Sequence, residues 1–147
     1  MKRNSRLALA LHTLGHMAVD PQRTRTSTEI AEHAGTNPVV VRRVLGKLRE
    51  AGLLSSEKGH AGGWRLARGA HSITLADVYI ALGENLVTAD ESGSGSDCSV
   101  ENALHHRISA VIENIEQSLI SQLSRTTIAE VQDLEECACR ACVPAAE

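Results

Sequence analysis

The sequence predicts a mainly α-helical protein with a winged helix-turn-helix and one long additional helix. Three observations predict this fold class. Two short helical patterns, residues 27–35 and 37–52, are separated by a tight glycine turn. A glycine-rich β-hairpin pattern follows them directly, over residues 53–68. Aliphatic residues then recur at helical spacing over residues 100–124.

The first helix is expected over residues 5–19, ending near Pro21. Its apolar residues recur at helical spacing, at Leu7, Leu11, Leu14 and Ala18. Because the basic N-terminus runs into this amphipathic pattern and no cleavage site follows, it is interpreted as a helix and not as a signal peptide. No window approaches the ~20 apolar residues of a membrane span. We therefore expect a cytoplasmic protein that makes no membrane contact, with cysteines that are thiols or metal ligands.

The next two helices carry clear end signals. Ser27 or Thr28 is the expected N-cap of the second helix, and Gly35 suits its end. Asn37 can cap the third helix, and Pro38 suits its first position. The apolar stripe of the third helix consists of Val41, Val44, Leu45 and Leu48, and its basic residues, Arg42, Arg43, Lys47 and Arg49, lie largely off it. This pattern favours a DNA-reading helix over a plain pair of packed helices.

The hairpin pairs residues 53–58 with residues 63–68 around a glycine-rich tip. Trp64 is the only Trp in a chain that has one Tyr and no Phe. We expect its indole to pack over the base of the hairpin and brace it against the third helix. Stacking on a nucleotide base is the alternative, but no neighbouring aromatic residue would complete a stacking platform.

The net charge of −3 is distributed unevenly. Residues 1–70 contain twelve Lys and Arg against five Asp and Glu, whereas residues 71–147 contain three against thirteen. Such asymmetry suggests that the first half meets a polyanion. A solvated basic face without a partner is the alternative.

A further helix is expected over residues 73–84, capped by Thr74, and an acidic Gly/Ser-rich loop follows over residues 87–97. The long helix would measure ~36 Å, so it either packs across its own winged helix or pairs with the same helix of a second subunit. We expect a homodimer through this helix. Its stripe consists of Leu104, Ile108, Val111, Ile112, Ile115, Leu119 and Leu123.

The chain is thus divided into four parts. Residues 1–84 form the DNA-binding domain and residues 85–99 a flexible loop. Residues 100–136 contain the dimerisation helix and a short final helix that starts at Thr126 or Thr127. Residues 137–147 form a Cys-rich tail.

Several of these segments together resemble the Rrf family of bacterial winged-helix regulators, over roughly residues 5–131. They are TSTEIAEHAGTNPVVVRRVLGKLREAGLL, KGHAGGWRLA, ITLADVYIAL, CSVENAL and TTIAEV. The resemblance implies a dimeric transcriptional regulator, a repressor that covers a promoter, on a pseudo-palindromic double-stranded DNA operator. It places the third helix in the major groove and the wing in the minor groove.

The resemblance also assigns residues to roles. The base-facing residues would be Asn37, Val39, Val40, Arg42 and Arg43. Lys58 and His60 would lie at the wing tip. An arginine can donate two hydrogen bonds to a guanine, and a valine can contact a thymine methyl group. The residues better placed to hold phosphates are Lys2, Arg3, Arg6, Thr26, Ser27 and Lys47.

The chain departs from the family pattern in its cysteines. Members that bind an iron–sulfur cluster have three cysteines ahead of the long helix, whereas this chain has only Cys98 there. A resident cofactor is therefore not predicted. Cys137, Cys139 and Cys142, with Cys98 as a fourth thiol, leave three alternatives: a zinc or cluster site, a redox sensor, or no function. His12 lies where some relatives supply a ligand, and we interpret it as a packed or surface residue.

Two other function classes are the alternatives to a DNA-binding regulator. The sequence contains no nucleophile–base motif, phosphate-binding glycine loop with Lys, or His-Glu metal motif, so an enzyme is not predicted. A winged helix used for protein–protein contacts is the second alternative, and the basic first half argues against it.

Overall fold

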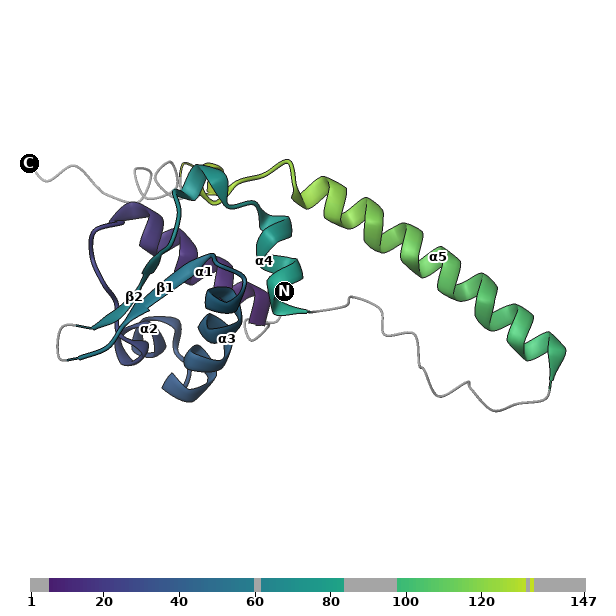
Figure 1. The fold of residues 1–147 in the computed structure, drawn as a ribbon, viewed down its shortest axis with the longest axis horizontal. Helices are drawn as coiled ribbons and strands as arrows, with labels where there is room; N and C mark the ends of the chain where they lie inside the picture. The colour runs from purple at the N-terminus through teal and green to yellow at the C-terminus, as the bar shows by residue number, and fades with distance from the viewer. Residues whose placement is uncertain (1–5, 60–61, 84–97, 132, 134–147) are drawn as a thin grey trace, which may run out of the picture.

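The computed structural model describes residues 6–59, 62–83, 98–131 and 133. The elements along the chain are α1 (Arg6–Val19), α2 (Ser27–Ala34), α3 (Pro38–Glu50), β1 (Leu54–Glu57), β2 (Gly63–Leu66), a 3₁₀ turn η1 (Ala70–Ser72), α4 (Leu75–Leu82) and α5 (Ser99–Leu123). Helices α1 to α4 and the hairpin form one body, from which α5 extends away (Figure 1). The predicted winged helix-turn-helix with a long additional helix is confirmed.

Side-chain caps explain where the short helices begin. The hydroxyl of Thr26 accepts a hydrogen bond from the Glu29 N–H at 3.2 Å, and the Glu29 carboxylate accepts one from the Thr26 N–H at 2.7 Å. The prediction of Ser27 or Thr28 as the cap was therefore wrong, because only Thr26 has an acidic residue three positions later to complete a capping box. The hydrogen bonds with Thr26, helped by Arg23, lower the pKa of the Glu29 carboxyl group.

The other predicted caps are confirmed. The Asn37 side chain accepts a hydrogen bond from the Val39 N–H at 2.7 Å, with Pro38 in the first turn of α3. Thr74 forms a second capping box with Asp77 at the start of α4. Gly35, at the end of α2, adopts a left-handed conformation with φ of 63°, which a glycine reaches without steric cost.

The core is aliphatic and lies between α1, α3 and α4. The predicted apolar stripe of α3 is fully buried in it, and Leu14, Val78 and Leu82 pack against that stripe. The core also contains Ile128, which lies beyond α5. The division of the chain into four parts stays a prediction, and Ile128 shows that its third part also contributes to the core of the first.

The two strands pair antiparallel, with Leu54 opposite Leu66 and Glu57 opposite Gly63. A third segment, which the sequence did not indicate, pairs with the outer side of β2. The Arg25 N–H donates to the Trp64 carbonyl at 3.0 Å, and the Trp64 N–H donates to the Arg25 carbonyl at 2.8 Å. The wing is therefore fastened to the segment immediately before α2.

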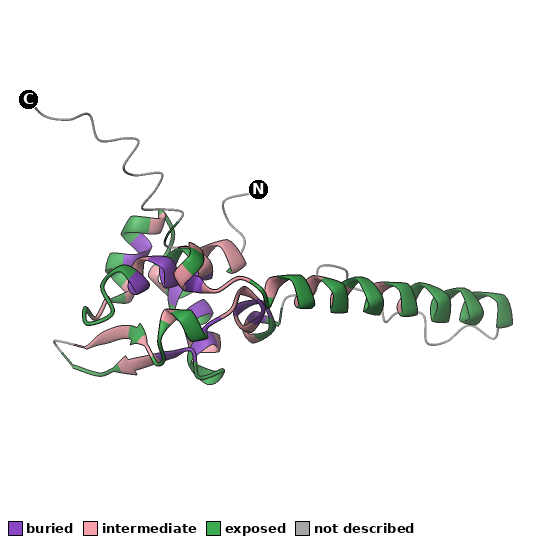
Figure 2. Cartoon of the chain, turned by 90° about the horizontal axis from the view of Figure 1, so that it is seen from above, coloured by how far each residue is buried: buried purple, intermediate pink, exposed green. Residues whose placement is uncertain are grey.

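Helix α5 has 25 residues, none of them buried, and most of its length is coloured as exposed in Figure 2. In the C-terminal half of α5, the Glu116 carboxylate accepts a hydrogen bond from the Tyr79 hydroxyl of α4 at 3.4 Å. Among the described residues, no helix is long and apolar enough to cross a membrane.

The chain after α5 returns to the body. The Leu75 N–H donates to the Thr126 carbonyl at 3.0 Å, and the Ile128 N–H donates to the Ile73 carbonyl at 2.9 Å. Residues 128–131 are helical, and the Thr127 hydroxyl and Glu130 carboxylate cap their first turn. The predicted start of a final helix at Thr126 or Thr127 is confirmed.

Candidate nucleic-acid interface

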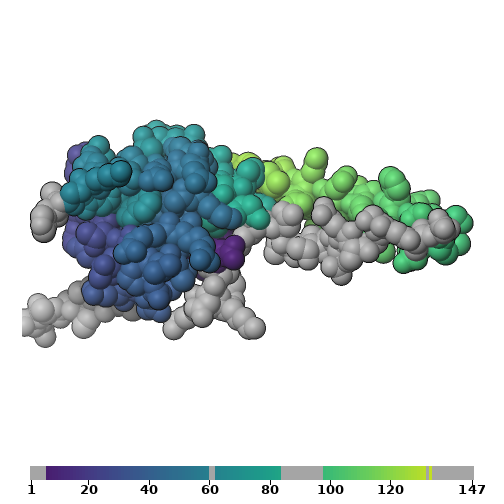
Figure 3. Space-filling model, turned by 60° about the horizontal axis from the view of Figure 1, so that its bottom comes forward, coloured from purple at the N-terminus to yellow at the C-terminus, as the bar shows by residue number. Residues whose placement is uncertain are grey.

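The outer face of α3 combines apolar and basic side chains that the fold leaves uncovered. Val39 is 55% exposed and Val40 is 41% exposed, although both are valines. Arg42 and Arg43 are exposed next to them, with no ion pair to another described residue. Figure 3 shows α2 and α3 on the surface that faces the viewer. The face combines guanidinium donors for base edges and phosphates with methyl groups for thymine contacts.

Asn37 lies at the start of this face, but its side chain is partly engaged. Its Oδ1 accepts the cap hydrogen bond from Val39. The amide NH₂ group keeps its two donors. In the capped helix, Asn37 can therefore still donate two hydrogen bonds to a base edge, and its Oδ1 keeps one further lone pair that can accept one.

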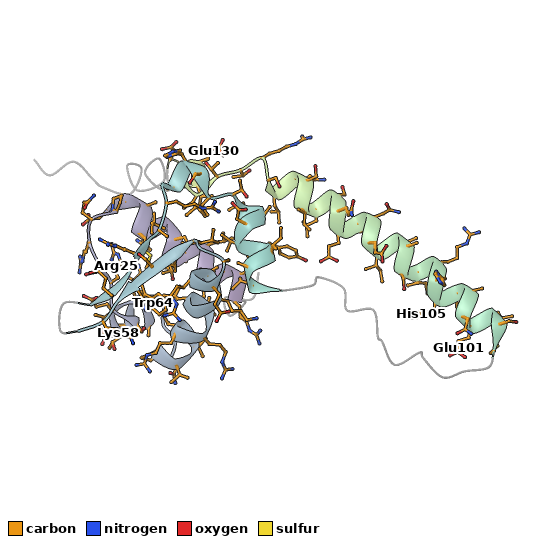
Figure 4. All side chains as sticks on the ribbon, in the orientation of Figure 1. Arg25, Lys58, Trp64, Glu101, His105 and Glu130 are labelled. Atoms are coloured by element: carbon orange, nitrogen blue, oxygen red, sulfur yellow. The ribbon has the colours of Figure 1, made fainter. Side chains whose placement is uncertain are left out.

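The wing carries charge toward its tip. Lys58 is exposed at the end of β1 and has no ion pair with another described residue. Arg65 on β2 is different, because its guanidinium binds the Glu57 carboxylate at 2.7 Å. Figure 4 shows Lys58 on the wing and Arg25 and Trp64 nearer its base. His60 lies outside the described residues.

Two wing glycines are required by close backbone approaches. A Cβ atom at Gly62 would collide with the Glu57 carbonyl oxygen across the turn. A Cβ atom at Gly63 would lie 2.8 Å from the Arg25 carbonyl oxygen and 3.0 Å from the carbonyl carbon. The glycine-rich tip thus has two distinct structural causes: the tight turn itself, and the contact of β2 with the segment before α2.

Trp64 braces the wing, as predicted. Its indole Nε1 donates to the Ser27 hydroxyl of α2 at 2.9 Å, and the Arg49 guanidinium of α3 lies 5.9 Å from the ring centroid. Trp64 is therefore held by both helices of the helix-turn-helix. The contact with α2 was not predicted.

Substituting Gly63 of the wing by alanine is expected to destabilise the protein, whereas the same substitution at Gly46 of α3 is expected to stabilise it. Gly63→Ala forces Arg25 away from β2, at a cost of about 1–3 kcal/mol in the free energy of unfolding. Gly46→Ala adds the same methyl group inside a helix where nothing lies within 4 Å, and should stabilise by about 0.5–1 kcal/mol. Urea denaturation of the two variants measures both effects. If both variants changed the free energy of unfolding in the same direction, the close approach of Gly63 to Arg25 would not be what requires the glycine.

Several residues predicted to hold phosphates have partners inside the fold. The Lys47 ammonium donates to the Leu82 carbonyl at the end of α4, at 2.8 Å. The Thr26 hydroxyl caps α2, and the Ser27 hydroxyl accepts from Trp64. Arg6 is exposed at the start of α1. Lys2 and Arg3 lie outside the described residues.

The predicted dimer stripe lies uncovered along α5. Leu104, Ile108, Val111 and Ile115 are 50–60% exposed, and Ile112, Leu119 and Leu123 are intermediate. A shallow groove of about 460 Å³ on the same helix is lined by Val111, Asn114, Ile115, Ser118, Leu119 and Gln122. The first of the two alternatives, packing of the stripe across its own winged helix, is not what the structure shows.

Cys98 is the N-cap residue of α5, exposed, and its thiol makes no capping hydrogen bond. The other three cysteines lie outside the described residues, so a joint site for the four thiols stays a prediction.

His12 is not a solitary residue, because its ring lies against those of His16 and His33. The i, i+4 spacing of His12 and His16 is a sequence signal for a shared helix face, and sequence reasoning overlooked it.

The family comparison agrees with this geometry. Residues 3–134 match the family model Rrf2, described as "Iron-dependent Transcriptional regulator". YwnA of Bacillus subtilis (strain 168), whose name describes a transcriptional regulator of the HTH type, is 32% identical, with 88% of this chain and 96% of YwnA covered. IscR of Vibrio parahaemolyticus, an HTH-type transcriptional regulator, is 30% identical over 74% of this chain and 68% of IscR. These names describe regulators and not enzymes.

Among solved structures, IscR of T. potens has the same fold, with a TM-score of 0.65 and 24% identity, covering 93% of this chain and 90% of that one. The residues matched by the family model, 3–134, include the winged-helix body, α5 and the returning segment up to residue 131. The resemblance seen in the sequence motifs is confirmed, and the chain belongs to the Rrf2 family of transcriptional regulators.

Proposed function

We propose that this DNA-binding transcriptional regulator works in the cytoplasm as a homodimer that recognises a pseudo-palindromic operator and represses by covering a promoter. The observation that carries the proposal is the outer face of α3. There, Arg42 and Arg43 are exposed beside two exposed valines and have no ion pair within the described residues. The other aliphatic residues of α3, Val41, Val44, Leu45 and Leu48, are buried. Two exposed valines on the same helix therefore fit a surface that is covered by a partner.

The proposed roles of the residues are those that the family resemblance assigns. Arg42 and Arg43 are assigned to base edges with Val39, Val40 and the amide donors of Asn37. Lys58 is assigned to the DNA backbone beside the wing, together with His60. The residues assigned to phosphates remain Lys2, Arg3, Arg6, Thr26, Ser27 and Lys47. Of these, Lys47 needs to leave the Leu82 carbonyl, or share its donors, to reach a phosphate.

The homodimer is supported by α5. A stripe of aliphatic residues on a helix of about 37 Å is uncovered in one chain, and pairing with the same stripe of a second chain buries both. Two-fold pairing places two copies of α3 on two half-sites one helical turn apart. The body and α5 are joined through α4 and through the returning segment at Ile128, so the dimer contact is coupled to the reading helices.

The family description names iron, but the residues ahead of α5 offer few thiol ligands. In the described part of the chain, Cys98 is the single cysteine, and residues 85–97 contain none. A cluster held by three cysteines ahead of α5 therefore does not fit this chain. We assign no step of DNA recognition to such a cluster.

Salt dependence provides the direct test of DNA binding. If each half of the dimer neutralises ~4 phosphates, log K should fall with log salt with a slope of about −7. The measurement is a gel-shift titration at several salt concentrations, on a duplex selected from a randomised pool. A slope shallower than about −2 would contradict operator binding and favour a module for protein–protein contacts.

Two substitutions in the same assay separate the assigned roles. Arg43→Ala should lose about 1–3 kcal/mol of DNA-binding free energy and relax the sequence preference at one base position. Lys58→Ala should instead weaken binding to all DNA sequences equally. Arg125→Ala, an exposed arginine after α5, is the control and should change neither affinity nor preference.

A further inference from the structure

Three histidines from two helices converge on one point of the winged-helix body. His12 and His16 lie one turn apart on α1, and His33 lies in the last turn of α2. The Nε2 atoms of His16 and His33 are 2.9 Å apart. One ring nitrogen from each of the three side chains can be chosen so that all lie within 4.8 Å of one another.

The spacing of these nitrogens is close to that of a metal site. With Zn–N bonds of 2.0–2.1 Å, ligands of a tetrahedral zinc ion lie about 3.3 Å apart. The three rings therefore need shifts of an ångström or so, which rotation about χ1 and χ2 can supply at exposed side chains. His12 and His33 are exposed and His16 is intermediate, so a fourth position is open toward solvent.

The surroundings of the rings also have room for an ion. A small cavity of about 30 Å³ is lined by the three histidines together with Thr13, Arg25, Glu29 and Ile30. A single water molecule needs ≳10–15 Å³ on this measure, so the space suits one ion or water molecule.

Some of the charges near the three histidines favour binding of a cation, and one opposes it. His16 and His33 each lie in the last turn of their helix, where the partial negative charge of the helix end favours a cation. The Glu29 carboxylate on the cavity wall acts in the same sense. The Arg25 guanidinium opposes it, but its Nη2 is directed to the His16 carbonyl oxygen at 3.3 Å.

A hydrogen bond between two neutral imidazoles explains the contact of His16 with His33, since one ring donates and the other accepts. It does not explain His12, whose ring centroid lies 4.5 Å from that of His16 and 5.3 Å from that of His33. Three imidazoles with converging nitrogens are a donor set that suits zinc, copper, iron and nickel ions.

We propose that His12, His16 and His33 bind one divalent transition-metal ion of the zinc class, which ties α1 to α2. The proposed ligands include no cysteine, and the site does not depend on DNA binding. Because α2 is the first helix of the helix-turn-helix and holds Trp64 through Ser27, the ion would stiffen the support of the wing.

The test uses the full chain with all four cysteines changed to serine, so that thiols cannot bind the metal. Titration with Zn²⁺ in a calorimeter should give one ion per chain. Co²⁺ should give the visible absorption of a low-coordinate, nitrogen-ligated site. Zinc at a hundredfold above its Kd should raise Tm by about 5–10 °C.

Ligand variants and a matched control make the test specific. His12→Gln and His33→Gln change exposed side chains, so both proteins should fold, as far-UV circular dichroism can verify. Each should weaken Zn²⁺ binding at least ~100-fold, since even loss of a residue that only supports a ligand costs 10–100-fold. His105→Gln is the control, because His105 is exposed near the far end of α5 (Figure 4), and it should bind zinc as the parent does.

Two results would overturn the proposal. One is absence of stoichiometric Zn²⁺ binding to the cysteine-free chain. The other is a zinc affinity that His12→Gln and His33→Gln leave unchanged. Because none of these measurements contains DNA, failure of the metal site would leave the salt-dependence test of operator binding untouched.

Discussion

Ile115→Glu is expected to convert the dimer to a monomer and to abolish operator binding. Ile115 is 55% exposed in the single chain and lines the shallow groove on α5. A carboxylate there lies in water when the chain is alone, so the fold of the monomer is not strained. In the dimer it would be buried without a partner, at a cost of several kcal/mol.

The loss of DNA affinity follows from losing the second half-site. Two linked binding sites gain about 10²–10⁴ in affinity over one alone, and a monomer has one copy of α3. Sedimentation should therefore show a monomer for Ile115→Glu. Even at protein concentrations about a hundredfold above those at which the parent binds, this variant should give no gel shift.

Gln117→Glu is the matched control, because it places the same charge on α5 about 200° around the helix from Ile115. Gln117 is exposed, and it is not among the residues that line the groove. This variant should remain dimeric and bind the operator. If the Ile115→Glu protein remained dimeric, the interface would have to lie outside the α5 stripe. Ile112 is less suitable for this test, because it is already half-buried within one chain.

The elements of the fold could be predicted because their signals are local. Asn37 and Pro38 mark the start of α3, and the spacing of its apolar residues predicts the face that is buried. The wing follows from two short extended runs around glycines. Each of these signals lies within one helix or one hairpin, where sequence spacing and spatial distance are closely related.

The supporting contacts could not be predicted, because their partners are far apart in sequence. Trp64 and Ser27 are 37 positions apart, and Lys47 and Leu82 are 35 apart. From the sequence alone, Ser27 and Lys47 are interpreted equally well as exposed polar residues without a partner in the fold. Lys47 was assigned to a phosphate for this reason, and the structure places its ammonium group on the end of α4.

The histidine site shows the same limit at shorter range. His12 and His16 share a helix face by spacing alone. The third ligand, His33, is 17 positions from His16 and comes within 2.9 Å of it only because α1 packs on α2. A sequence pattern can therefore supply two ligands of such a site, whereas the third needs the packing of helices.

The return of the chain after α5 to the core is a further feature that sequence spacing did not predict. Ile128 is completely buried, and it packs in the same core as Leu14, Leu45 and Val78. Its N–H also donates to the Ile73 carbonyl at 2.9 Å. The segment thus closes a connection from the C-terminal end of α5 back to the winged helix, in addition to the contact of α5 with α4.

Ile128→Ala is expected to lower the free energy of unfolding by about 2–5 kcal/mol, because it removes three buried carbon atoms and leaves a cavity beneath α4. Urea denaturation at a fixed protein concentration measures the loss. Ile80→Ala is the matched control, since Ile80 is 58% exposed on α4 and its truncation should change stability by no more than about 0.5 kcal/mol. A loss below about 1 kcal/mol for Ile128→Ala would mean that the core closes without this segment. Helix α5 would then be joined to α3 through α4 alone, and substitutions in the returning segment should leave operator affinity unchanged.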